Sequence, residues 1–168
     1  IEEEVDILLI GGGMGACGAA YELGPWLDAA KAQGHDIKVK LVDKAAMDRS
    51  GAVAQGLSAI NTYLGENDPA DYARMVSNDL MGITRDDLVY DLGRHVDDSV
   101  HLFEEWGLPI WKRPGDEGKS LKDGGSPVRS GKWQIMINGE SYKWIVAEAA
   151  KKALGMDRIQ EHVFIVKL

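Results

Sequence analysis

The sequence predicts an α/β fold in which a parallel sheet is flanked by helices. Two short apolar runs, residues 5–10 and 37–42, have the length of buried strands, and a helical pattern over about 14–33 separates them. The first run breaks directly into the glycines at 11–13. A strand, a glycine corner and a helix in this order are typical of a Rossmann-like fold.

The glycine corner predicts a site for a dinucleotide pyrophosphate. Glycines let the backbone approach the phosphates without a Cβ, and the helix N-terminus directs its amides and positive dipole end at them. Gly11, Gly13 and Ala16 fit the G-x-G-x-x-G/A spacing. A second register through Gly13, Gly15 and Gly18 also fits, which leaves the phosphate contacts open; the alternative is a plain strand–turn–helix corner. The candidate cofactor-binding residues here are Gly11, Gly12, Gly13, Met14, Gly15 and Ala16.

The second strand is expected to deliver Asp43 and Lys44 to the same site. An acid at this place accepts hydrogen bonds from the adenosine ribose hydroxyls. Its distance from the glycines exceeds the usual ~20 residues, which an insertion at Gly24-Pro25 explains. That proline should also kink or break the first helix. The alternative for Asp43 is a surface acid beside Lys44.

Small side chains fill residues 45–59, where the backbone can lie against a flat, bulky ligand. Such a segment packs poorly by itself. The candidate cofactor contacts in it are Ser50, Gly51, Ala54, Gln55, Gly56, Leu57 and Ser58.

Two helices are expected next. Asp68 and Pro69 form an N-cap and N1 pair that opens a helix over residues 69–81. A second cap begins one continuous helix over 84–106, because its apolar residues recur at threes and fours.

The last third contains a surface loop and further regular elements. Glycine, serine and charged residues over 113–132 predict the loop. Residues 133–137 predict a strand, and Ser141 is expected to cap a helix that ends near residue 154. Residues 163–168 have the pattern of another strand.

Composition narrows the classes of partner and compartment. The net charge of -8 argues against nucleic acid as a main partner. The single cysteine, Cys17, excludes an internal disulfide and fits a reducing, cytoplasmic compartment. No apolar run approaches the roughly 20 residues of a membrane span, and no signal peptide is evident, so membrane contact is expected to be at most indirect.

The ends of the chain suggest that it is part of a longer polypeptide. It begins at Ile1 rather than Met, and it stops inside an apparent strand. A doubly wound domain needs several parallel strands, and few are present. We therefore expect residues 1–168 to be the incomplete N-terminal part of a cofactor-binding domain, with 113–132 as a surface loop within it.

Several segments resemble one protein family. These are LLIGGGMGACGAAYE, DRSGAVAQGLSAINTY, and WGLPIW followed by WQIMINGESYK. They are similar to the alpha subunits of dissimilatory adenylylsulfate (APS) reductases, within the fumarate reductase/succinate dehydrogenase flavoprotein family. The glycine motif is common to all such flavoproteins, whereas SGAVAQGLSAINT and INGESYK are specific.

The resemblance implies an FAD-dependent oxidoreductase. Adenylylsulfate would be cleaved reductively to sulfite and AMP, or formed in reverse, through a flavin N5–sulfite adduct. Electrons would come from an iron–sulfur beta subunit carrying [4Fe-4S] clusters, with no metal ligand in this chain. Many relatives carry a flavin-linking histidine after Arg-Ser; here Gly51 follows Arg49-Ser50, which implies noncovalent FAD.

The resemblance also implies two catalytic residues. Asn61 matches a family asparagine near the flavin ring and sulfite, where its amide donates to an oxyanion without adding charge. Glu140 matches a family acid that orders the adenylate or relays a proton. The alternatives are a turn residue for Asn61 and a dipole-favoured acid at a helix N-terminus for Glu140. The cations that bind the substrate anion are expected beyond Leu168.

Two other functions remain open from the sequence. One is a soluble flavoprotein, like fumarate reductase or L-aspartate oxidase, that acts on a dicarboxylate or an amino acid. The other is a non-enzymatic nucleotide-binding module that uses only the glycine motif and leaves residues 50–62 without a role.

Overall fold

The structure is a computed structural model that describes residues 2–66 and 68–168. Contacts divide these residues into two compact units, and each is described by itself. Unit 1 holds the described residues up to Leu57 together with Gly139–Leu168, and unit 2 holds those of Ser58–Asn138.

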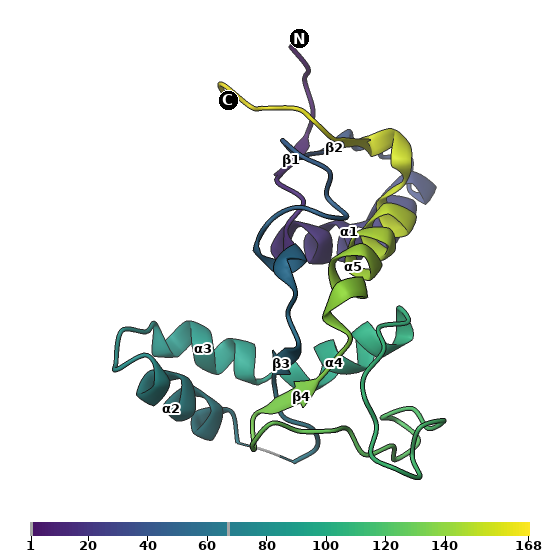
Figure 1. Ribbon diagram of the computed structural model, residues 1–168. Coiled ribbons are helices and arrows are strands. Elements are labelled where there is room, and N and C mark those ends of the chain that lie inside the picture. Colours follow the sequence, from purple (N-terminus) through teal and green to yellow (C-terminus); the bar gives the residue numbers. More distant parts are fainter. Residues whose placement is uncertain (1, 67) are drawn as a thin grey trace. The chain divides into compact units, whose positions relative to one another are not determined.

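Unit 1 contains a parallel sheet with the strand order β1-β2-β5. Its elements are β1 (Ile7–Ile10), α1 (Met14–Ala32), β2 (Val39–Val42), the 3-10 turn η1 (Ala52–Gln55), α5 (Gly139–Leu154), the 3-10 turn η2 (Met156–Arg158) and β5 (Ile159–Gln160). Leu9 pairs with Leu41, and Leu41 pairs with Ile159 on its other side. The predicted α/β fold with a parallel sheet is confirmed (Figure 1).

The strand predicted at residues 163–168 is wrong. The third strand of the sheet is β5, which pairs with the last two residues of β2. His162 then adopts a positive φ of 61°, which interrupts the extended backbone. The Val163 amide still donates to the Asp43 carbonyl, but β2 has already ended there, so the following residues have no strand to pair with.

Helix α1 continues through Pro25, so the predicted break is absent. Proline supplies no backbone N–H, so α1 lacks one helical hydrogen bond at this position. Gly24 lies on the buried face of α1 against α5, where a Cβ would come within 2.4 Å of the Ala153 carbonyl oxygen. Close backbone approach of α1 and α5 therefore requires a glycine at this position (Figure 1).

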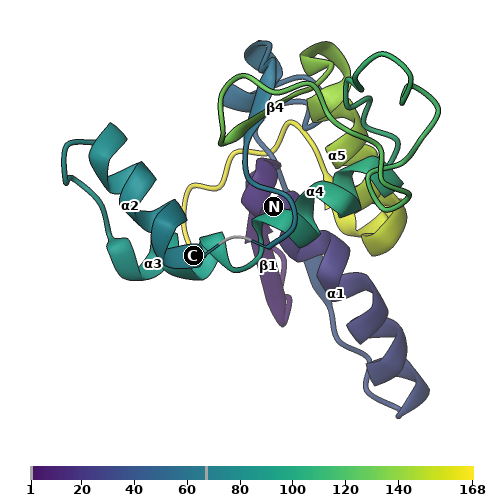
Figure 2. The ribbon, with the colours of Figure 1, turned by 90° about the horizontal axis from the view of Figure 1, so that it is seen from below.

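Unit 2 combines a short antiparallel ribbon with three helices. Its elements are β3 (Ala59–Asn61), α2 (Pro69–Asp79), α3 (Asp86–Gly93), α4 (Val96–Glu105) and β4 (Gln134–Met136). Ile60 of β3 pairs with Ile135 of β4. Helices α2 and α3 lie side by side in both views (Figure 2). Asp68 caps α2 as predicted, since its side chain accepts a hydrogen bond from the Ala70 amide at 2.9 Å.

The single helix predicted over residues 84–106 is wrong, because the chain forms α3 and α4 with a break between them. The Tyr63 hydroxyl donates to the Gly93 carbonyl, which a continuous helix would use internally. Tyr63, Tyr72 and Val96 form a buried core cluster beside this break. The two tyrosine rings also meet Trp133 edge to face at about 5.8–5.9 Å between centroids.

Residues 113–132 contain no regular helix or strand, only isolated bridges such as Lys112 with Pro127. Glu104 of α4 anchors this segment. Its carboxylate accepts from Lys112 Nζ at 2.5 Å and from the Leu121 amide at 2.7 Å, and Leu121 is buried. None of the helices in the described parts of the chain combines the length and the apolar character that a bilayer crossing requires.

We predict opposite effects of alanine at two glycines of α1. Gly24→Ala should destabilise unit 1 by about 1–3 kcal/mol, because the new methyl group overlaps the Ala153 carbonyl. Gly18→Ala should stabilise it by roughly 0.5–1 kcal/mol, since no atom lies within 4 Å of that Cβ. Hydrogen exchange of the α1 amides measures both effects, and equal changes would contradict the close packing.

Candidate functional site

The glycine corner leaves the start of α1 open to an anion. Gly11 has a φ of +93°, and its amide donates to the Val42 carbonyl at 2.7 Å, which ends β1. Gly13 is the N-cap of α1; it provides no side-chain cap, and the first turn contains no acid. A Cβ at Gly13 or Gly15 would meet no atom within 4 Å. The first amides of the helix are therefore available to phosphate oxygens.

Asp43 is buried directly after β2 and holds this corner. Its Oδ2 accepts from the Gly12 amide at 2.7 Å, and its Oδ1 accepts from the Ala45 amide at 3.0 Å. Each carboxylate oxygen can accept a further bond, so these contacts are compatible with a ribose hydroxyl as an additional donor. Its neighbour Lys44 is exposed.

Gly12 is enclosed where the other glycines are open. A Cβ there would lie 2.4 Å from both Asp43 Oδ2 and Met47 Cβ, so no larger residue fits. Lys143 of α5 donates from Nζ to the Gly12 carbonyl at 2.5 Å and also to the Met47 carbonyl. Asp43 and Lys143 thus hold opposite ends of one glycine.

Lys143 was missed by the sequence reasoning. Its side chain is only 3% exposed, although lysine normally keeps its charge in water. A signal was present, since Lys143 occupies the buried stripe of α5 with Val146, Ala147 and Ala150 at helical spacing. A lysine within such an apolar stripe deserves a search for a partner.

The segment of small residues bends at two glycines. Gly51 and Gly56 have φ angles of +86° and +93° and bracket η1. Ser50 donates from its hydroxyl to the Ala46 carbonyl. At Leu57 the backbone approaches α5 so closely that a Cβ on Gly139 would lie 1.6 Å from the Leu57 carbonyl oxygen. The close approach at Leu57 therefore depends on the glycine at the start of α5, not on small side chains of the segment itself.

The remaining candidates of that segment differ in exposure. Ala54 is half-buried, and its amide donates to the Gly51 carbonyl at 3.2 Å. The exposed ones are Gln55, Gly56, Leu57 and Ser58. Ser58 belongs to unit 2, where its carbonyl accepts from the Ile137 amide at 3.0 Å.

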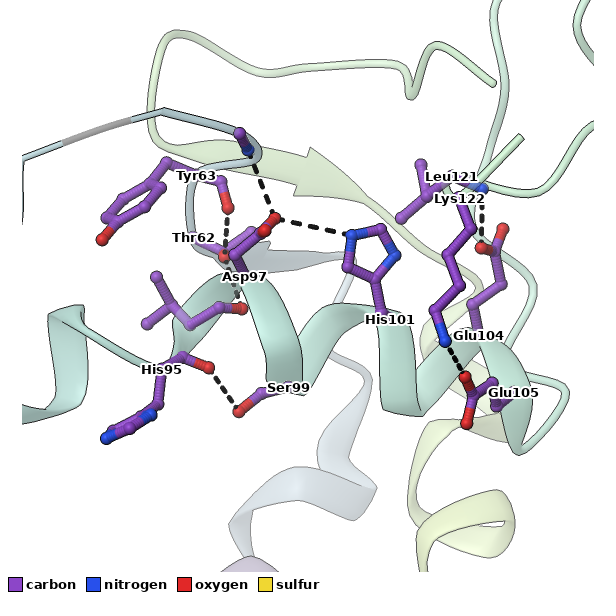
Figure 3. A network of polar contacts seen from close by, with 12 residues as sticks. Thr62, Tyr63, His95, Asp97, Ser99, His101, Glu104, Glu105, Leu121 and Lys122 are labelled. Atoms are coloured by element: carbon purple, nitrogen blue, oxygen red, sulfur yellow. Dashed lines mark hydrogen bonds and ion pairs between the residues drawn. The ribbon is translucent and has the colours of Figure 1, made fainter. Parts of the chain in front are cut away.

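Asn61 ends β3 with an exposed side chain on a firmly held backbone. It pairs with Gln134 of β4. The next residue, Thr62, is fully buried; its amide donates to the Trp133 carbonyl at 2.6 Å and its hydroxyl to the Val96 carbonyl at 3.1 Å. Figure 3 shows Thr62 and Tyr63 beside α4, whose first residue, Val96, accepts the hydrogen bond from the Thr62 hydroxyl. Thr62 therefore fixes the direction in which β3 presents Asn61.

Glu140 is an exposed residue in the first turn of α5. An acid there is favoured by the helix dipole, so the geometry accommodates a structural as well as a catalytic role. Glu140 belongs to unit 1 and Asn61 to unit 2.

Cys17 lies beneath the corner with its thiol buried. Its Sγ donates to the Gly12 carbonyl at 3.4 Å. Burial raises the pKa of this thiol; nearby Lys143 opposes the shift and Asp43 adds to it. No cluster of three or more His, Cys, Asp or Glu side chains suited to a metal occurs among the residues that the structure describes.

Comparison with known proteins gives one consistent result. The chain is 64% identical to the adenylylsulfate reductase subunit alpha of Megalodesulfovibrio gigas over 181 aligned positions, which include 100% of this chain and 26% of the relative. The resemblance stated from the motifs is confirmed. The chain thus spans about a quarter of the length of this relative. No protein-family model matches it.

Solved structures agree with the sequence comparison. Adenylylsulfate reductase from Archaeoglobus fulgidus is 57% identical with a TM-score of 0.79, over 96% of this chain and 24% of that one. A structure of adenosine-5-phosphosulfate reductase in complex with sulfite, as a covalent adduct, is 57% identical with a TM-score of 0.78. The match covers 95% of this chain and 24% of that one. E. coli quinol fumarate reductase shares the fold alone. It is 19% identical with a TM-score of 0.62, and the match covers 94% of this chain and 25% of that one.

We predict that native Cys17 resists alkylation. The thiolate is the reactive form, and a buried thiol with a raised pKa supplies little of it at about pH 8. Iodoacetamide labelling followed by mass spectrometry should be slow in the native protein and fast in denaturant. Equal rates in the two conditions would show that the thiol is accessible.

Thr62→Val should loosen β3 with little change in volume. It removes the hydrogen bond to the Val96 carbonyl, which is worth about 1 kcal/mol. Faster hydrogen exchange is expected for the amides of β3 and the first turn of α4, while the amides of unit 1 serve as the internal control. Unchanged exchange in β3 would contradict the positioning role of Thr62.

Proposed function

Because this chain resembles the alpha subunit of adenylylsulfate reductase along its whole length, in sequence and in fold, we propose that it is part of an FAD-dependent oxidoreductase. The reaction is the reductive cleavage of adenylylsulfate to sulfite and AMP, or its reverse. The observation that carries the proposal is the 57% identity to a relative whose structure holds sulfite as a covalent adduct.

The glycine corner fits the diphosphate of FAD. Its open, uncapped helix start offers amides to an anion. Asp43 lies beside it, where its carboxylate can accept a hydrogen bond from a ribose hydroxyl. Gly51 carries no side chain that could bond to the flavin, so the cofactor is held noncovalently. When bound, FAD supplies the two-electron redox chemistry of the reaction.

The proposed cofactor contacts divide into two groups. The residues of the corner and the end of β2 bind the diphosphate and adenosine ribose; they are Gly11, Gly12, Gly13, Met14, Gly15, Ala16, Asp43 and Lys44. Those of the small-residue segment present backbone to the flavin ring; they are Ser50, Gly51, Ala54, Gln55, Gly56, Leu57 and Ser58. Residues 1–168 then belong to an FAD-binding domain that is incomplete within this chain, and 113–132 form a surface loop of it.

Asn61 and Glu140 are proposed to act on the substrate. The Asn61 amide donates to sulfite oxygens, which stabilises negative charge without introducing a cation. Glu140 orders the adenylate or transfers a proton. Support for both comes from the motifs SAINT and NGESYK that contain them.

Electron supply is assigned to a partner. The relative is named a subunit alpha, which supports a second subunit, and we propose that this beta subunit carries the [4Fe-4S] clusters. The single cysteine of this chain, Cys17, cannot provide a cluster ligand set. The complex is placed in the cytoplasm, with any membrane contact made indirectly through an electron donor. A dicarboxylate substrate gains no support, since the likeness to fumarate reductase concerns the fold alone.

The proposal predicts that the intact alpha–beta protein has a flavin absorption band that bleaches when sulfite is added. Asn61→Ala should raise the sulfite concentration for half-bleaching by about tenfold, the effect of one lost hydrogen bond to a charged group. Asn78→Ala, an exposed asparagine in α2 of the same unit, is the matched control and should bleach like the unaltered protein.

Absorption titration separates the outcomes. A flavin band that is indifferent to both sulfite and AMP would overturn the substrate assignment. Normal bleaching in Asn61→Ala would remove this residue from the site while leaving the reaction in place.

A further inference from the structure

Lys143 is a buried cation without a carboxylate partner. Its side chain is 3% exposed, and its two hydrogen-bond acceptors are the neutral carbonyls of Gly12 and Met47. None of the ion pairs among the described residues includes Lys143, whereas Lys151 of the same helix pairs with Glu148 at 3.5 Å. Burying an ammonium group is costly unless an opposite charge compensates for it. The buried Asp43 carboxylate, which accepts from the Gly12 amide, lies on the other side of the same glycine, so both groups act on the backbone of Gly12.

The same contacts determine where one amide points. The Gly12 amide donates to Asp43, and the Gly12 carbonyl accepts from Lys143. In a trans peptide the C=O and the following N–H point in opposite directions. Fixing the Gly12 carbonyl toward Lys143 thus turns the Gly13 amide away from the core. Gly13 is exposed on that side, with no atom within 4 Å of a Cβ.

We propose that Lys143 is a positioning residue for the diphosphate of the bound dinucleotide. It holds the Gly12–Gly13 peptide so that the Gly13 amide donates to a diphosphate oxygen. Its positive charge also stabilises the diphosphate dianion from the other side of the Gly12 backbone. The identity of the dinucleotide as FAD rests on the proposed function. The positioning itself rests on the contacts of Gly12.

A purely structural role makes a different prediction. Lys143 also ties α5 to the turn after β2 through the Met47 carbonyl. If that contact were its whole role, substitution of Lys143 would lower the stability of the protein and would weaken the binding of FAD and of riboflavin equally. The positioning role affects the diphosphate and leaves contacts of the flavin ring unchanged.

The test uses the intact alpha–beta protein stripped of FAD. Lys143→Gln removes the charge and keeps an amide donor for one carbonyl, while Lys143→Met removes the charge and the hydrogen-bond donor. Lys152→Met is the matched control, an exposed lysine on the same helix. Flavin fluorescence gives the Kd of FAD and the Kd of riboflavin, which contains the ring but no phosphate.

Lys143→Gln should raise the Kd of FAD about tenfold, and Lys143→Met should raise it further, as expected for a lost charge-assisted interaction. The Kd of riboflavin should stay constant in both, and Lys152→Met should match the unaltered protein. Because Lys143→Gln keeps a donor, it preserves the comparison if Lys143→Met does not fold.

Two results would overturn the inference: unchanged FAD affinity in Lys143→Gln, or an equal loss of FAD and riboflavin affinity. Failure of the unaltered protein to bind FAD would instead refute the proposed function.

Discussion

The organisation of unit 1 depends on the two-sided fixation of Gly12. Asp43 from the end of β2 accepts its amide hydrogen, and Lys143 from α5 donates to its carbonyl. Three elements far apart in the sequence therefore meet at one residue without a side chain. This arrangement places two buried, opposite charges on either side of one glycine residue and leaves the start of α1 facing outward, where an anion can bind.

Local signals were sufficient for the parts of this site that are local. The strand, the glycines and the helix of the corner follow one another in the chain, so their spacing predicts the local fold, while the phosphate contacts stay a prediction with two possible registers. The Asp68 cap of α2 was equally readable, because capping acts within a few residues. Asp43 was placed at the corner correctly, although its bond to the Gly12 amide depends on the packing of β1 against β2.

The sequence-based predictions were wrong, or missed a residue, where contacts between distant parts of the chain determine the local structure. The helix break after α3 occurs because Tyr63, distant in sequence, takes the Gly93 carbonyl. Residues 163–168 have strand-forming side chains, but β2 ends before they could pair with it. Lys143 escaped notice because a lysine is normally read as exposed, and only the fold shows the two carbonyls that it contacts.

The proposed function depends on the binding of the FAD diphosphate at the α1 corner. An experimental structure of the intact protein with FAD tests it most directly. We expect diphosphate oxygens within hydrogen-bonding distance of the first α1 amides, with Lys143 still bonded to the Gly12 carbonyl. A diphosphate bound away from this corner, or a protein that crystallises with the corner empty and FAD elsewhere, would contradict it.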